Sequence, residues 1–267
     1  MTRTASPSSF APERLSSGAA GSVLLVDFQP YSSGKRLGDF VAADATNVSV
    51  QQIEPARDLS GRTDYLSLDE IAAHYADAYR ECADPDDTMV VGYCSAAVLA
   101  VRIAALLTNS RRVRVALLRP TWPDTAMISE ILGDVRAEIG AAGEPPPELV
   151  AAPQAVLHGI SDTLHRDLRA LASLHGLDPT SRPLLELLER YQGWFGYLLA
   201  AREAVDGLTG RASQPPAEVL VLAESAEQAA VPGLAAGSYH RRLVQLPDGA
   251  ADLVTGELAR LLLAELG

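Results

Sequence analysis

The sequence predicts an α/β fold with a mostly parallel sheet that is flanked by helices on both faces. Short apolar runs take turns with segments whose apolar residues recur at helical spacing, which is typical of alternating strands and helices. The apolar runs are continuous, as expected for strands that are covered on both sides. The chain has 267 residues, of which 48% are hydrophobic and 21% charged, so it can form a substantial core.

The first elements are expected in order from residue 22. Segment 22–28, SVLLVDF, reads as a buried strand that ends in the turn-rich stretch QPYSSGKRLG. A helix is predicted over 66–82, with Ser67 as its N-cap. The further elements of this part are a strand within NVSVQQIEP (47–55), a strand ending in MVVGY, an apolar helix in SAAVLAVRIAALLTNS, and a strand in RRVRVALLRP (111–120).

From about residue 125 the pattern changes to helices alone, and strand character returns at AEVLVLAES (217–225) and RRLVQLPDG, before a last helix. We therefore expect three parts in the chain. Residues 1–21 are predicted to be a flexible N-terminal tail, because they are polar. Residues 22–124 and 211–267 are predicted to form the core, and residues 125–210 a helical lid inserted between its two parts.

The composition excludes several classes of function. A net charge of −12 argues against nucleic-acid binding, which needs clustered basic residues. No segment reaches the roughly 18 uninterrupted apolar residues of a membrane span, and the N-terminus has no secretory signal, so a cytoplasmic protein is expected. Cys82, Cys94 and the scattered histidines lack metal-site spacing, so we expect free thiols and neither a metal nor a bound cofactor.

The segment VVGYCSAAVLAVRIAALL (91–108) takes a strand into a helix through a turn of small residues. This pattern is typical of the nucleophile elbow of α/β-hydrolases, in which a strained central residue needs small neighbours where strand and helix crowd together. Gly92 and Ala96 meet that need and place Cys94 at the centre. The N–H groups at the start of the helix would favour its thiolate. Tight packing around an inert cysteine remains the alternative.

Two further features support a nucleophile at Cys94. His240 follows a late strand and precedes the last helix, which gives the expected order of nucleophile, then histidine. The loop FQPYSSG follows the first strand, where such enzymes supply an N–H of the oxyanion hole. A surface histidine is the alternative for His240.

With these motifs in order, the chain resembles the thioesterases of polyketide and nonribosomal peptide assembly lines, of the type II or terminal kind. LLVDFQPYSSG resembles their first strand and loop, VVGYCSAAVLAVRIAALL their elbow and helix, and GSYH their late histidine motif. The sequence departs from the family at three positions. Cys94 stands where serine is usual, Ala96 replaces the second elbow glycine, and Arg119 stands where the acid of the triad is expected.

The resemblance implies roles for individual residues. Cys94 would attack a thioester carbonyl with His240 as the general base, and the N–H groups of Tyr31 and Ser95 would hold the oxyanion. The acid stays open between Asp124, Glu224 and Glu227. An aromatic cluster of Trp194, Phe195 and Tyr197 would line an acyl pocket, unless it is ordinary core.

The resemblance also implies the chemistry. The substrate would be an acyl thioester carried on phosphopantetheine by an acyl or peptidyl carrier protein, or on CoA, and the acyl group would pass through Cys94 to water, an amine or an alcohol. Two alternatives remain: a hydrolase-fold binding protein that has lost catalysis, and a cysteine hydrolase of the dienelactone type.

Overall fold

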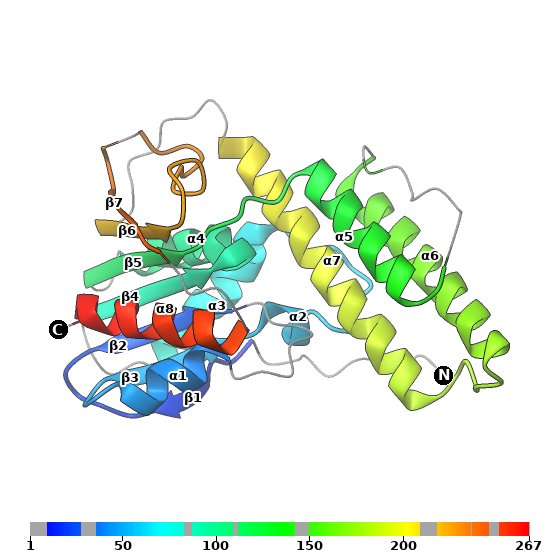
Figure 1. Ribbon diagram of the computed structural model, residues 1–267, viewed down its shortest axis with the longest axis horizontal. Coiled ribbons are helices and arrows are strands. Elements are labelled where there is room, and N and C mark those ends of the chain that lie inside the picture. The colour runs from blue at the N-terminus through cyan, green and yellow to red at the C-terminus, as the bar shows by residue number, and fades with distance from the viewer. Residues whose placement is uncertain are drawn as a thin grey trace.

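In a computed structural model of the chain, the described residues are 10–27, 36–82, 87–108, 112–141, 149, 151–208, 218–235, 237–245 and 251–266. Within these ranges, seven strands form one sheet in the order β1-β3-β2-β4-β5-β6-β7, in which β1 alone is antiparallel to its neighbour (Figure 1). The strands are β1 (Glu13–Ser16), β2 (Ser22–Val26), β3 (Ser49–Ile53), β4 (Asp87–Tyr93), β5 (Arg112–Leu118), β6 (Glu218–Ala223) and β7 (His240–Leu243). The helices are α1 (Leu37–Asp44), α2 (Pro55–Asp58), α3 (Leu68–Cys82), α4 (Ala97–Leu107), α5 (Thr125–Glu138), α6 (Pro153–Leu174), α7 (Arg182–Leu208) and α8 (Ala251–Leu266).

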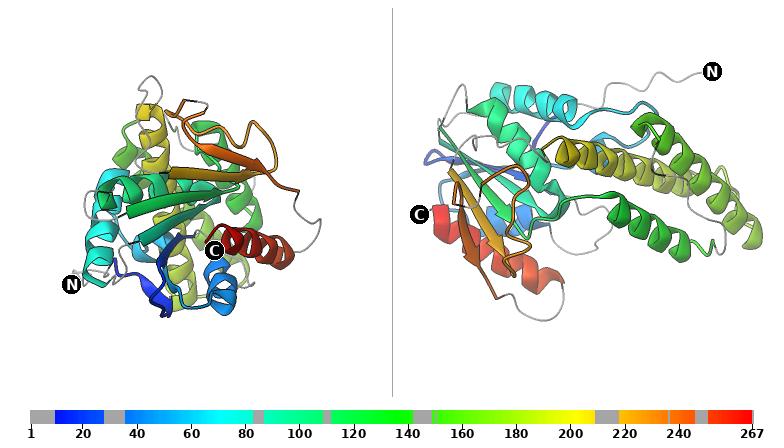
Figure 2. Two further views of the ribbon diagram at one scale, coloured as in Figure 1. Left: turned by 90° about the vertical axis from the view of Figure 1, so that its left-hand side faces the viewer. Right: turned by 90° about the horizontal axis from the view of Figure 1, so that it is seen from above.

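The sheet is covered on both faces, which confirms the predicted α/β class and explains the continuous apolar strands. Helices α3 and α4 cover one face, and α1 and α8 cover the other (Figures 1 and 2). In β2 the side chains divide by alternation: Leu24 and Val26 join the core under α3 and α4, while Val23 and Leu25 join the core under α1 and α8.

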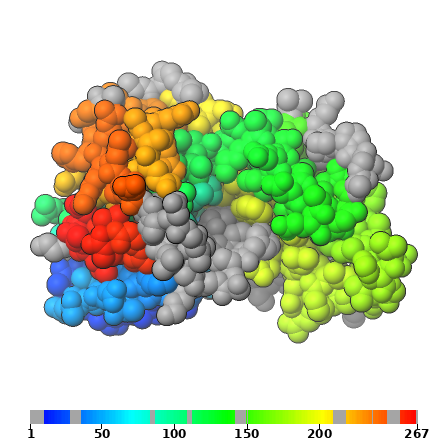
Figure 3. Space-filling view, viewed as in Figure 1, coloured from blue at the N-terminus to red at the C-terminus, as the bar shows by residue number. Residues whose placement is uncertain are grey.

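Helices α5, α6 and α7 lie between β5 and β6 in the chain and extend beyond the carboxyl edge of the sheet (Figure 2). In the space-filling view of Figure 3 these three helices lie on the right, and β6, β7 and α8 lie on the left. Helix α7 packs on α2, α3 and α4, and its apolar side chains belong to the same core as the strands. A buried ion pair between Arg136 and Asp167, at 2.7 Å, joins α5 to α6. These helices occupy the span for which the sequence predicts a lid, and that role stays a prediction.

Within the part of the chain that the structure describes, no helix is long and apolar enough to cross a bilayer.

The N-terminal region corrects one expectation. The flexible tail predicted for residues 1–21 is wrong for residues 10–21, because Glu13–Ser16 forms β1 on β3 and the ring of Phe10 stacks on His74 with centroids 4.7 Å apart. A strand of four largely polar residues has no apolar pattern to reveal it. No pattern in the sequence indicates α1, which begins inside the stretch that is expected to be a loop.

The start of α3 agrees with the prediction. The Ser67 hydroxyl accepts a hydrogen bond from the Glu70 N–H, and the Glu70 carboxylate accepts one from the Ser67 N–H, at 3.3 and 2.8 Å. This reciprocal pair is a capping box, which satisfies two donors at the helix start.

The order of the strands places a binding region at one edge of the sheet. The chain passes from β2 outward to β3 and then returns past β2 to β4, so the connections after β2 and β4 lead in opposite directions. Parallel sheets bind ligands beyond the carboxyl ends of their strands at such a switch point. Val26 of β2 pairs with Gly92 of β4, so Asp27 and Cys94 both follow strands that end there.

The crossing between β4 and α4 depends on Gly92. A Cβ at this position would lie 2.7 Å from the Ala100 Cβ and 2.7 Å from the Ala97 Cα, closer than real Cβ contacts. The absence of a side chain therefore lets the helix start directly against the strand, as the elbow pattern predicts.

We expect Gly92→Ala to lower the free energy of unfolding by about 1–3 kcal/mol, because backbone of α4 must move to admit the methyl group. The measurement is thermal unfolding followed by circular dichroism. Gly133→Ala is the matched control: Gly133 lies within α5 with nothing within 4 Å of its would-be Cβ, so the same change there raises helix propensity by up to about 1 kcal/mol. Equal unfolding temperatures for wild type and Gly92→Ala would contradict the packing argument.

Candidate active site

Cys94 lies at the tip of the turn between β4 and α4, in the conformation that a nucleophile elbow requires. Its φ of +55° is in the left-handed region, which is uncommon for any residue except glycine. A 3₁₀ turn, Cys94–Ala96, leads directly into α4, so the thiol lies beside the amino end of the helix. The side chain is half-buried, and both Cys94 and Cys82 are free thiols.

Thr121 contacts Cys94 twice from the connection between β5 and α5. Its Oγ1 lies 2.7 Å from the Cys94 Sγ. Its backbone N–H donates to the Cys94 carbonyl at 3.2 Å. The two contacts fix both the backbone and the thiol of Cys94. Sequence reasoning missed Thr121, because nothing in the local pattern indicates that this connection crosses the elbow.

Tyr197 supports the elbow from below. Its hydroxyl donates to the carbonyl of Ser95 at 2.7 Å, and burial raises its pKa far above the ordinary value. Tyr197 and Phe195 are fully buried and Trp194 is partly exposed. Of the three residues expected to line an acyl pocket, Phe195 and Tyr197 therefore pack as core residues here, and Trp194 alone retains exposed surface.

Arg119 stands at the end of β5, at the position where the acid of a triad is expected. Its φ is +45°, and its N–H donates to the Leu222 carbonyl of β6 at 2.7 Å. The guanidinium is 2.8 Å from the carboxylate of Glu224, which follows β6. Its positive charge also acts on Tyr93, whose pKa is raised chiefly by burial and is lowered in part by this cation. A cation thus occupies the expected place of the acid.

His240 is not brought to Cys94. It begins β7 and pairs with Leu220 of β6, which lies level with Ala116 of β5 and Val91 of β4. From strand spacings, His240 is three strands away and about 10 Å further back along the strand direction. Its exposed side chain lines a cavity of about 320 Å³ with Arg114, Glu218 and Glu265. The expected order of residues along the chain is present, but His240 lies within β7, short of the carboxyl edge at which the elbow stands and three strands from it.

The three residues expected as candidates for the acid of the triad lie at separate positions. Asp124 is the N-cap of α5, where its carboxylate accepts from the Met127 N–H at 2.7 Å. Glu227 is exposed in the turn after β6. Glu224 is the one of the three that reaches the cluster around Cys94, through its ion pair with Arg119. Among the described residues, no hydrogen bond or ion pair joins any of the three to His240, so the expected triad is not assembled there.

The structure describes only one of the two residues that are expected to form the oxyanion hole. Ser95 follows Cys94 in the 3₁₀ turn, where a backbone N–H at the start of a helix is suited to that role. Tyr31 lies outside the described residues. The segment that contains it is bounded by Asp27, which is buried at the end of β2, and by Arg36 at the start of α1.

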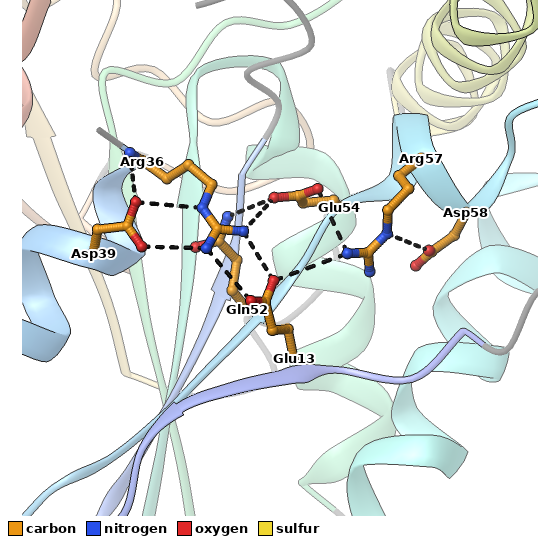
Figure 4. A network of polar contacts seen from close by, with 7 residues as sticks. All are labelled: Glu13, Arg36, Asp39, Gln52, Glu54, Arg57 and Asp58. Atoms are coloured by element: carbon orange, nitrogen blue, oxygen red, sulfur yellow. Dashed lines mark hydrogen bonds and ion pairs between the residues drawn. The ribbon is translucent and has the colours of Figure 1, made fainter. Parts of the chain in front are cut away.

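A polar network fixes the α1 end of that segment (Figure 4). Arg36 pairs with Glu13 of β1 at 2.9 Å, with Glu54 after β3 at 2.8 Å and with Asp39 of α1 at 3.2 Å. The hydrogen bond from Arg36 holds the pKa of Glu13 below its usual value. Arg57 continues the network from Glu54 to Asp58. One guanidinium therefore ties three elements together at the carboxyl edge of the sheet.

Within the described ranges, no three His, Cys, Asp or Glu side chains come together as metal ligands would. The described cluster at the elbow consists of the Cys94 thiol, the hydroxyls of Thr121 and Tyr93, the Arg119 guanidinium and the Glu224 carboxylate.

A search against models of protein families finds no match, and neither does a search of curated proteins. Solved structures with similar folds do exist. A four-domain nonribosomal peptide synthetase bound to AMP and glycine superposes with a TM-score of 0.58 at 13% identity over 96% of this chain, which corresponds to 20% of the synthetase. The Vlm2 thioesterase domain bound with a dodecadepsipeptide gives 0.54 at 18% identity, covering 97% of this chain and 99% of that domain.

A protein from Desulfitobacterium hafniense, described as an α/β-hydrolase family protein, gives a TM-score of 0.53 at 16% identity, covering 96% of this chain and all of the other. At these identities the likeness concerns the fold, which is that of the α/β-hydrolases.

We expect the hydroxyl of Thr121 to govern the reactivity of Cys94. A hydroxyl that donates to a thiolate stabilises the charged form and also lowers its nucleophilicity. Thr121→Val should therefore slow the alkylation of Cys94 by iodoacetamide about threefold at neutral pH, because the loss of a hydroxyl that stabilises the reacting sulfur outweighs the gain in nucleophilicity.

The measurement is the alkylation rate by peptide mass spectrometry, with Cys82 as the internal reference. Thr121→Ser, which keeps the hydroxyl, should react at the wild-type rate. Equal alkylation rates for the Val and Ser variants would contradict this role of the hydroxyl.

Proposed function

We propose that the protein is an acyl-transfer protein of the thioesterase type, in which Cys94 accepts an acyl group from a thioester. The observation that carries this proposal is the positive φ of Cys94 at the strand-to-helix turn, because it exposes a nucleophile beyond the sheet at an energetic cost that inert packing does not need. The fold likeness to thioesterase domains, one of them bound with a depsipeptide, supports the same class of substrate.

The first step needs no histidine. The Cys94 sulfur forms a bond to the thioester carbonyl carbon, and the carbon–sulfur bond of the donor breaks, so that one thioester replaces another. The proton of Cys94 passes to solvent, and the leaving thiolate departs without prior protonation. A few per cent of an ordinary cysteine is thiolate at pH 7, and that fraction is intrinsically a strong nucleophile.

In the second step the acyl group leaves Cys94, and the catalytic help that this step needs depends on the acceptor. Hydrolysis needs a base to activate water, and the described residues bring no histidine to Cys94. An amine with an unprotonated lone pair attacks a thioester carbonyl without such help. The carbon–sulfur bond to Cys94 then breaks, and the proton lost by the nitrogen passes to the departing thiolate or to solvent. We therefore favour transfer to an amine over hydrolysis, with the acyl group held on Cys94 in between.

The donor that fits this chemistry is an acyl chain on a phosphopantetheine arm, either of an acyl or peptidyl carrier protein or of CoA. The thioester on that arm is chemically equivalent to the one formed at Cys94, so loading is nearly balanced in free energy. No metal or bound cofactor takes part in the proposed steps.

One observation favours a second candidate, a binding protein that has lost catalysis. Arg119 occupies the expected place of the acid and His240 lies away from the elbow, so neither partner of a conventional triad is in position. In that case an acyl thioester would bind at the carboxyl edge without reacting.

We expect a mass gain equal to one acyl group at Cys94 when the protein is incubated with acyl-pantetheine thioesters. Because the described residues bring no histidine to Cys94 to activate water, the adduct should persist for many minutes and should be discharged by added amines. The measurement is intact-protein mass spectrometry with peptide mapping.

Three variants sharpen this experiment. Cys94→Ala should give no adduct, and Cys94→Ser should also give none, since an alcohol without a base is a poor nucleophile. His240→Ala should load at the wild-type rate, because His240 lies away from the elbow. Binding of the thioester without any adduct would establish the binding-protein candidate instead. Slow loading of His240→Ala would overturn the proposed mechanism, in which loading needs no histidine base.

A further inference from the structure

Two strained residues lie side by side at the carboxyl edge of the sheet. Among the described residues, three non-glycine residues have positive φ: Asn47, Cys94 and Arg119. Asn47 lies in a turn, and asparagine tolerates this conformation, whereas arginine has no such tolerance. Strain of this kind persists only where the surrounding structure enforces it, and it concentrates at functional sites.

The register of the sheet places Arg119 next to Cys94. Tyr93 of β4 pairs with Leu118 of β5, and Cys94 and Arg119 are the residues that follow. Neighbouring strands lie about 4.8 Å apart, so the two residues leave the sheet one strand apart. Both also act electrostatically on Tyr93, the residue that precedes Cys94.

The guanidinium of Arg119 has donors to spare. Arginine carries five N–H donors in a planar fork that matches a carboxylate. Among the described residues, its ion pair is with Glu224, at 2.8 Å. The Arg119 side chain is 34% exposed, so it is accessible to a ligand bound at the elbow.

A ligand carboxylate can displace Glu224 from its ion pair with Arg119. Its two side chains are 34% and 41% exposed, and solvent screening makes exposed pairs of this kind weak. A ligand carboxylate that binds the fork with two hydrogen bonds competes well with such a pair. Glu224 and the buried Asp27 are the nearby anions that oppose a second negative charge, and they limit the site to ligands that engage Arg119 directly.

We infer that Arg119 binds an anionic group on the acyl chain itself, so that the preferred donors are thioesters of dicarboxylic acids, with the free carboxylate a few bonds from the reacting carbonyl. This rests on the proposed acyl transfer at Cys94. The phosphate of the phosphopantetheine arm does not suit the position, because the whole length of the pantetheine chain separates it from the sulfur that must meet Cys94.

The test compares two donors that differ in charge alone. Succinyl-pantetheine and succinamoyl-pantetheine have the same shape, but the second carries a neutral amide in place of the carboxylate. Loading of Cys94 is followed by intact-protein mass spectrometry, and the readout is the ratio of the two rates. We expect a ratio of about ten or more in the wild type, the size of one charge-assisted hydrogen bond.

Variants then assign the ratio to Arg119. Arg119→Gln should reduce it toward one, and Arg119→Lys should retain part of it. Glu224→Gln should raise it, because the competing carboxylate is removed. A wild-type ratio near one overturns the inference. A ratio that stays high in Arg119→Gln overturns the assignment to this residue.

A second arm separates this inference from the proposed function. Cys94→Ala cannot be loaded, so binding of the two donors to this variant is measured by calorimetry. Tighter binding of succinyl-pantetheine that is lost in the double variant with Arg119→Gln supports anion recognition even if no acyl transfer occurs in the wild type. Equal affinities for the two donors overturn it.

Discussion

The close contact between β4 and α4 is the constraint on which the rest of the site depends. Gly92 lets the helix begin directly against the strand, and the chain makes this abrupt turn by forcing Cys94 into a left-handed conformation. That conformation aims the thiol beyond the sheet and turns the carbonyl of Cys94 toward the Thr121 N–H. Tyr197 holds the next carbonyl from α7, so the insertion and the sheet both maintain the turn.

Much of the fold could be predicted from the sequence, because the central strands are long apolar runs and α3 and α4 have clear helical patterns. The elbow could be predicted for the same physical reason that it forms, namely that a crowded turn needs small residues. The outer elements could not: β1 is short and polar, and α1 follows a stretch rich in turn residues. Local composition carries little information where tertiary contacts decide the structure.

The site was predicted only in part. The order of nucleophile and histidine along the chain is visible in the sequence, but the edge of the sheet at which each residue lies depends on where a strand begins. His240 begins β7 and therefore lies at the wrong level for Cys94. Thr121 and the strained backbone of Arg119 leave no signal in sequence either, because they depend on a connection that crosses the elbow and on a register between two strands.

The charged side chains of the two outermost strands, β1 and β7, affect how copies of the protein can associate. All four residues of β7 are exposed, and they include His240, Arg241 and Arg242, while β1 carries Glu13 and Arg14 and has an irregular register beside β3. A second chain that tried to extend the sheet would have to strip water from these charges along its whole length. Both margins are therefore poor templates for fibrils, and they protect the apolar strands between them against edge-to-edge aggregation at high concentration.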